Sequence, residues 1–384
     1  MSNTEAMQRA LTDVVSRGDF VVPPYPAVAM RLQRLLAREG YGVGEVAEVL
    51  AADVGLAATV LAAANAALLG GGGEITSLSR AVNRLGARTV GSIAIASGVG
   101  AITISTGVLL DVKFRVWRRG MTCALACQKL AAAHGLVPEE AFLAGLLHGF
   151  GRSIAIASLE QLLKTHQPPR PLSAAEWLNI AEQHRGVLAH AVVKNWQLPP
   201  LIADAVDSGA QTASSPLKEL ALQADKIAGD LDAGRMPETQ SPGDARLVDE
   251  LIAGLPAALE AFAPPAPALT TRPAPPSPVL AKPDHALDGE LRKKTLTVTD
   301  RRTKAAASLT CLSIAAQGIE VESSRPFQES SVVRLTLEHG DIHLEPWFNV
   351  VLCAPSGARY RVELQLFSPT RELRDQWRAL YDAP

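Results

Sequence analysis

The sequence has little of what usually marks an enzyme or an exported protein. It contains only four cysteines in 384 residues, and no two of them have Cys-X-X-Cys spacing. We interpret Cys123 and Cys127, four residues apart on an expected helix, as small buried side chains rather than a redox pair or metal ligands. No P-loop, dinucleotide-binding glycine motif or serine-hydrolase elbow stands in a supporting context. We therefore expect no cofactor and no disulfide-forming compartment.

An excess of charge of one sign is also missing. The formal net charge is −2, so no overall basic field attracts nucleic acid, and we expect no nucleic-acid partner. Residues 1–19 mix charged and apolar side chains and lack the hydrophobic region of a signal peptide. Residues 89–110 carry no charge and are long enough to cross a bilayer, but glycine and hydroxyl residues interrupt them. They predict one or two buried helices, and we expect a cytoplasmic protein without a membrane span.

The sequence pattern divides the chain into three parts. Residues 20–232 repeat apolar side chains at helical spacing and predict an almost entirely helical domain. A run of proline and alanine between 263 and 283 predicts an extended linker. Beyond it, short apolar runs separated by turn signals, followed by a helix at 371–381, predict a small β-barrel or sandwich. We assign a helical domain to 1–235, a helix plus linker to 236–287 and a β-barrel domain to 288–384.

The segment 145–152 reads Gly-Leu-Leu-His-Gly-Phe-Gly-Arg and lies between two expected helices, 139–148 and 154–164. It resembles the "LLHDIGK" turn of HD-type metal phosphohydrolases, with Gly149 in the place of the aspartate. A divalent metal site of that kind needs an imidazole and a carboxylate side by side, because a histidine alone binds such a cation weakly. The segment therefore predicts the scaffold of a hydrolase without its chemistry.

Several further stretches, in order along the first 232 residues, resemble the HDOD domain, a bacterial all-helical signalling module related to HD phosphohydrolases. They include a proline-led opening helix, an apolar helix preceded by Asp53, and a helix that begins after Trp117. The stretches that carry the likeness are 23–36, 49–61, 64–66, 75–86, 144–152 and 190–199. The resemblance implies a regulatory or scaffolding domain rather than an enzyme.

The resemblance also locates the positions of the metal ligands in catalytic relatives. The first histidine position falls near Arg119 or Gly120, and the terminal histidine pair falls near residues 207–209. None of these residues is histidine. We expect at most two imidazoles, His148 and His190, to converge without a carboxylate. Two buried core histidines are the first interpretation, and a residual mononuclear metal site is the alternative.

Residues 288–384 resemble a divergent PilZ-type barrel, a domain that in many bacteria binds cyclic di-GMP. The likeness lies in strand order, in the closing helix and in residues 311–319, where Cys311 replaces the usual acidic or amide residue. The expected pair of arginines four residues apart is not met, because Leu296 follows Arg292 at that spacing. The candidate ligand-binding residues are Arg292, Arg301, Arg302, Ser313 and Gly318.

We therefore expect an all-α HDOD-like domain followed by a small PilZ-like β-barrel. The function that these resemblances imply is a non-catalytic bacterial signal-transduction adaptor that binds other signalling proteins. Two alternatives stay open at this point. One is a cyclic di-GMP receptor that uses the barrel, and the other is a residual metal-dependent phosphodiesterase that uses His148 and His190.

Overall fold

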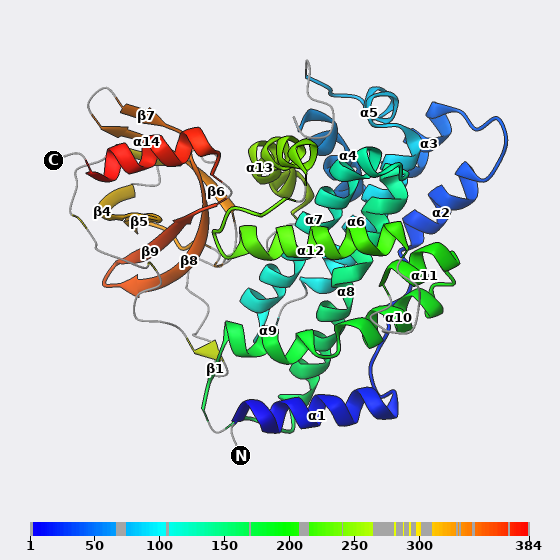
Figure 1. The fold of residues 1–384 in the computed structure, drawn as a ribbon, viewed down its shortest axis with the longest axis horizontal. Coiled ribbons are helices and arrows are strands. Elements are labelled where there is room, and N and C mark those ends of the chain that lie inside the picture. The colour runs from blue at the N-terminus through cyan, green and yellow to red at the C-terminus, as the bar shows by residue number, and fades with distance from the viewer. Residues whose placement is uncertain are drawn as a thin grey trace. The chain divides into compact units, whose positions relative to one another are not determined.

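The computed structural model describes most of the chain. The described residues are 3–66, 74–104, 107–168, 170–206, 215–239, 241–263, 280–281, 287, 292, 297–300, 309–327, 329, 332–339, 342–367 and 369–382. The chain forms two compact units (Figure 1). Met1–Asp230 with Met236–Pro264 make a helical unit, and Leu231–Arg235 with Pro265–Pro384 make a sheet unit.

The helical unit confirms the all-helical prediction for the first part of the chain. Its helices are α1 (Asn3–Arg17), α2 (Ala27–Leu36), α3 (Val43–Ala51), α4 (Val54–Asn65), α5 (Leu78–Leu85), α6 (Ala87–Thr103), α7 (Leu110–Ala131), α8 (Pro138–Leu162), α9 (Ala174–Glu182), α10 (Arg185–Asn195), α11 (Pro200–Val206), α12 (Pro216–Asp232) and α13 (Pro242–Phe262). A 3₁₀ turn, Ala132–His134, follows α7, and a two-residue strand, β1 (Leu172–Ser173), precedes α9. Helix α13, which the sequence analysis placed beside the linker, belongs to this unit.

Side-chain caps set the beginnings of several helices. The Asp53 carboxylate accepts a hydrogen bond from the Leu56 backbone N–H at 3.0 Å, as expected for the N-terminus of α4. Ser173 and Glu176 form the reciprocal pair of a capping box at the start of α9. Each cap satisfies backbone donors that would otherwise lack partners, so these short polar sequences predict the helix beginnings well.

Helix α8 differs from the sequence prediction. Two helices were expected, separated near 149–153, but Pro138–Leu162 is one continuous helix. Its glycines do not break the helix. They lie where the backbones of neighbouring helices approach α8 closely. A Cβ at Gly149 would lie 3.2 Å from Gly120 Cα of α7, and one at Gly151 would lie 1.9 Å from the Arg185 carbonyl oxygen of α10. The glycines therefore allow close packing on both sides of α8.

Helix α8 is the centre of the helical unit. It contacts α1, α6, α7, α9, α10 and α11. Among the described residues it is also the one helix long and apolar enough to cross a membrane, yet 78% of its apolar window is buried within the protein. Such burial is typical of a core helix. Most of the uncharged stretch 89–110 lies in α6, and its last residue begins α7.

The sheet unit is an antiparallel half-barrel with one helix. Its strands are β2 (Leu280–Ala281), β3 (Thr297–Asp300), β4 (Leu309–Ala315), β5 (Gly318–Ser323), β6 (Val332–His339), β7 (Ile342–Leu344), β8 (Trp347–Ser356) and β9 (Arg359–Leu366), and α14 spans Arg371–Asp382. The seven-stranded sheet has the order β3-β4-β5-β9-β8-β6-β7, and β3 also pairs with β6. The core contains Ile314, Val321 and Phe348, and Trp377 of α14 packs edge-on against Phe348.

The run 309–321 reads as one strand in the sequence but forms two. Ala316 and Gln317 make a turn between β4 and β5, and Gly318 begins β5 opposite Gln365 of β9. A Cβ at Gly318 would lie 2.1 Å from the Leu364 carbonyl oxygen. Gly318 therefore allows a close backbone approach that any larger residue would prevent.

Candidate functional site

A cluster of charged side chains lies at the position where the sequence resemblance places a metal site. Helices α7, α8 and α12 contribute one side of it, and the ends of α9 and α10 contribute the other. Its members are Arg119, His148, Arg152, Glu182, Arg185 and Asp225. His148 and Arg152 are one helical turn apart on α8, so both side chains project into the same space.

Arg152 is the central cation of this cluster. Its side chain is only 3% exposed. Its Nη1 and Nη2 atoms donate to the two carboxylate oxygens of Asp225 at 2.9 and 2.8 Å. Its Nε and Nη2 atoms donate to the two oxygens of Glu182 at 2.5 and 3.2 Å. One planar guanidinium therefore holds two carboxylates in fork geometry, the arrangement that gives arginine its strongest ion pairs.

The Asp225 carboxylate also has a second cationic neighbour. Arg119 donates to both of its oxygens, at 3.3 and 3.1 Å. Burial by itself would raise the pKa of Asp225, but Arg152 and Arg119 together hold that pKa well below its usual range. Asp225 is therefore ionised at neutral pH, and its negative charge is matched by two guanidinium groups.

His148 is fixed by an arginine rather than prepared for a metal. Arg185 Nη1 lies 2.6 Å from His148 Nε2 and 3.2 Å from the His148 carbonyl oxygen. Because a guanidinium has no acceptor, it is the donor, and the Nε2 lone pair accepts. Burial, and then the charge of Arg185, lowers the pKa of His148 to about 4. The Nε2 atom of His148 is thus already engaged, in a neutral ring.

This burial predicts a stability that depends on pH. The ordinary pKa of 6.5 applies to the unfolded chain, which therefore binds a proton at His148 before the folded chain does. The stabilising contribution is complete above about pH 6.5 and is lost as the pH falls through 4, by roughly 3 kcal/mol. Urea unfolding of the His148→Gln chain should show a flatter pH dependence across this interval. His190→Gln, at an exposed position, is the control. If the free energy of unfolding of His148→Gln falls as steeply with pH as that of His190→Gln, the assignment is contradicted.

The two positions that would carry the first ligands face each other as glycines. Gly120 of α7 and Gly149 of α8 allow the helix backbones to meet, as the 3.2 Å distance from a Cβ at Gly149 to Gly120 Cα shows. The void beside them, which Trp117 and Ser153 also line, measures about 10 Å³. Such a space holds one water molecule at most.

The donor set does not fit a divalent metal either. Within the residues that the structure describes, no group of three or more histidine, cysteine, aspartate or glutamate side chains could hold a metal ion. The expected partner of His148 is not in place, since His190 lies on the exposed side of α10. The interpretation of both residues as buried core histidines fits His148 and is wrong for His190. Residues 207–209, the remaining ligand positions, lie outside the described residues.

The expectation that no carboxylate reaches this place is also wrong, because Asp225 and Glu182 are both there. Sequence reasoning missed Asp225 although a signal was present. It is a charged residue on the apolar face of α12, beside the buried Ala221, Ala224 and Ala228. A charge in such a position implies a buried partner of opposite sign. Glu182 pairs with Arg152 and Arg185.

Of the five candidate ligand residues of the sheet unit, the structure describes Arg292, Ser313 and Gly318. Arg292 stacks on the Tyr381 ring with its guanidinium carbon 4.2 Å from the ring centre, and donates to the Tyr381 carbonyl oxygen at 3.2 Å. Ser313 is buried and donates to Glu320 at 2.8 Å. Gly318 has no free space above its Cα. Arg301 and Arg302 lie outside the described residues.

Comparison with known proteins identifies the helical unit. The family described as HDOD domain matches residues 22–211. A solved protein of Shewanella amazonensis SB2B, provisionally named a metal-dependent phosphohydrolase, is 21% identical with a TM-score of 0.54, covering 68% of this chain and 100% of that one. Another, from Marinobacter aquaeolei VT8 and provisionally named a signal transduction protein, is 19% identical with a TM-score of 0.46, covering 68% and 66%. At these identities the first likeness shows the fold alone.

One curated relative also matches the chain. It is an uncharacterized protein of Treponema pallidum (strain Nichols), 20% identical over 195 residues. The match covers 48% of this chain and 37% of that relative. The chain therefore spans little more than a third of the relative's length.

Proposed function

Because residues 22–211 match the family described as HDOD domain, we propose that the helical unit is a non-catalytic signalling adaptor that acts by binding other proteins. The observation that carries this proposal is Arg152, a buried guanidinium held by Asp225 and Glu182. In a metal phosphohydrolase, carboxylates of this kind would serve a cation and its activated water. Here a side chain of the protein itself provides the positive charge.

The balance of charge supports the same conclusion. Arg119, Arg152 and Arg185 surround two carboxylates, so the cluster keeps a net positive charge while His148 stays neutral. A positive cluster repels a divalent cation, and no carboxylate remains unpaired to coordinate one. The cluster instead ties α7, α8, α9, α10 and α12 together. Helices held together in this way suit a domain that presents a fixed surface to partner proteins.

Metal analysis of the full chain tests the non-catalytic half of the proposal. We expect no stoichiometric iron, manganese or zinc after purification from metal-supplemented medium, and no phosphodiester hydrolysis above that of His148→Ala. Stoichiometric metal that is lost in His148→Ala would overturn the proposal and favour a residual phosphodiesterase. The second part of the proposal, that the helical unit binds other proteins, requires a partner that associates with the purified full chain. Substitution of exposed residues of the helical unit should abolish that association.

Restoring the aspartate of the motif provides a sharper test. We expect Gly149→Asp to bind no metal and to lower the free energy of unfolding by about 1–3 kcal/mol, because its Cβ enters the contact with Gly120. Gly149→Ala is the matched control, since it adds the same Cβ without the carboxylate. Metal binding by Gly149→Asp but not by Gly149→Ala would show that the site needs only one carboxylate to function.

A further inference from the structure

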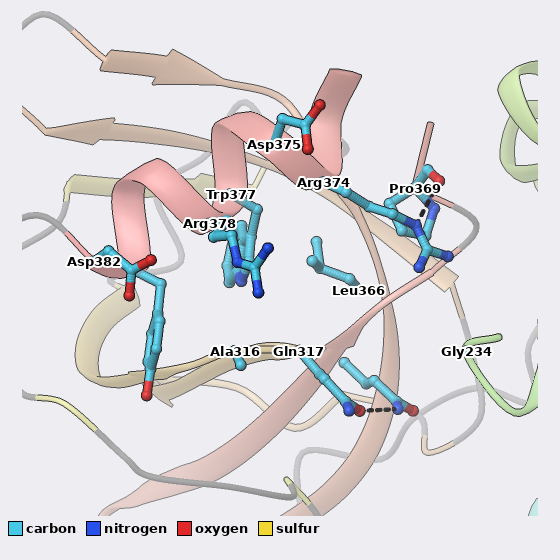
Figure 2. A pocket seen from close by; sticks show the side chains of 12 residues that line it. Gly234, Ala316, Gln317, Leu366, Pro369, Arg374, Asp375, Trp377, Arg378 and Asp382 are labelled. Atoms are coloured by element: carbon cyan, nitrogen blue, oxygen red, sulfur yellow. Dashed lines mark hydrogen bonds between the residues drawn. The ribbon is translucent and has the colours of Figure 1, made fainter. Parts of the chain in front are cut away.

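The sheet unit contains a cavity that none of the residues discussed above explains. It measures about 530 Å³ and lies between α14, the end of β9 and the turn that joins β4 to β5 (Figure 2). This volume is within the range of pockets that bind small molecules. Leu366 and Trp377 form apolar parts of its wall.

One face of α14 places two arginines and a tyrosine in the wall of this cavity. Arg374, Arg378 and Tyr381 follow one another at spacings of four and three residues, so they share a face of the helix. The rotation of α14 is fixed by its buried side, where Trp377 Nε1 donates to the Ala315 carbonyl oxygen at 3.1 Å. The two guanidinium groups are therefore held beside the cavity by the packing of the core.

Neither guanidinium is neutralised by a carboxylate in the part of the chain that the structure describes. Arg374 Nε donates to the Pro369 carbonyl oxygen at 3.3 Å, which leaves its terminal nitrogens available. Burial lowers the pKa of Arg374, as expected for a cation without a counter-ion. Arg378 forms no ion pair within 4 Å there, and Figure 2 shows Asp375 pointing away from the cavity.

The remaining charged groups nearby are already engaged with each other. Asp382 lies 3.6 Å from Arg292, and Arg292 stacks on the Tyr381 ring. On the opposite wall the side-chain amides of Gln317 and Gln365 lie 3.4 Å apart and carry no charge. The lining thus contains two guanidinium groups and two neutral amides, together with Asp382, which lies beside Arg292, and Asp375, which points away from the cavity.

From these observations we propose that this cavity binds a small organic molecule that carries a phosphate monoester. Two guanidinium forks match the oxygen geometry and the double negative charge of a phosphate monoester. The amides add hydrogen bonds without changing the charge. Inorganic phosphate alone would leave most of the cavity empty, so the organic part occupies the space along Leu366 and Tyr381. This site goes beyond the adaptor function and does not depend on it.

Calorimetric titration of the full chain with phenyl phosphate tests the proposal. We expect saturable binding, with inorganic phosphate binding more weakly and benzoate more weakly still, since a carboxylate offers one charge and two oxygens. Arg378→Gln and Arg374→Gln should each weaken phenyl phosphate binding by about tenfold or more, because each removes a charge-assisted hydrogen bond. Arg246→Gln removes the same charge from an exposed side chain of the helical unit, which does not line the cavity, and this variant should bind as the unchanged chain does.

Three results would overturn the assignment. One is the absence of saturable binding of phenyl phosphate at millimolar concentration. Another is binding that neither Arg378→Gln nor Arg374→Gln weakens relative to Arg246→Gln. The third is equal binding of benzoate, which would assign the cavity to carboxylates. Because Arg378 is exposed, its substitution leaves the core intact, and lost binding in that variant reports on the site rather than on folding.

Discussion

Replacement of Arg152 by methionine is expected to lower the free energy of unfolding by about 3–5 kcal/mol. The side chain is almost completely buried and holds Asp225 and Glu182 through four hydrogen bonds. Methionine fills a similar volume but offers no charge, so the buried Asp225 carboxylate keeps only Arg119 as a partner. Urea unfolding at pH 7, followed by circular dichroism at the helical signal, measures the loss in the helical unit.

Two further variants separate the charge effect from simple loss of packing. Asp225→Leu combined with Arg152→Met removes both buried charges and should recover part of the lost stability, because paired removal of buried ions costs less than removal of one partner. Arg38→Met removes an exposed arginine that pairs with Glu45 at 3.3 Å and should cost no more than about 1 kcal/mol. The interpretation fails if Arg152→Met is as mild as Arg38→Met.

The ends of helices could be predicted from the sequence because their causes are local. Asp53 and the pair Ser173 and Glu176 act on backbone groups three residues away, and the chain shows such pairs directly. The glycines of α8 illustrate the opposite case. In the sequence Gly149 and Gly151 indicate an interruption, but their role depends on α7 and α10, which lie close only after folding.

The candidate site shows the same limit. The absence of an aspartate after His148 is visible in the sequence, and it predicts an altered metal position. What replaces it is not visible, because Arg152 of α8 and Asp225 of α12 are 73 residues apart and meet only in the folded helical unit. The exposed place of His190 was missed for a related reason, since α10 buries Leu188, Ala189, Val192 and Val193 instead.

In the sheet unit, alternation of apolar residues predicted most strands, since each strand buries one face. The turn at Ala316 and Gln317 was missed because β4 and β5 are both apolar where they meet it. The spacing of Arg374, Arg378 and Tyr381 on a helix could be read directly. The cavity beside them could not, because it also requires the end of β9 to face α14.

Substitution of Gly151 by alanine is expected to lower the free energy of unfolding by about 3 kcal/mol or more. The new methyl group would lie 1.9 Å from the Arg185 carbonyl oxygen and 2.9 Å from the Ala189 backbone nitrogen, so the backbone of α10 must move. That movement displaces the Arg185 guanidinium from Glu182 and His148. The same urea unfolding experiment measures the loss, and the pKa of His148 should rise toward its ordinary value as Arg185 withdraws.

Gly44→Ala in α3 is the matched control, because nothing lies within 4 Å of its Cβ position and the helix there is exposed. Alanine should stabilise that helix by roughly 0.5–1 kcal/mol through its higher helix propensity. The two substitutions are chemically identical and are expected to have opposite signs, so helix propensity alone does not account for the pair. A Gly151→Ala chain that is as stable as Gly44→Ala would mean that α8 and α10 are not in close contact, and the position assigned to Arg185 beside His148 would then be wrong.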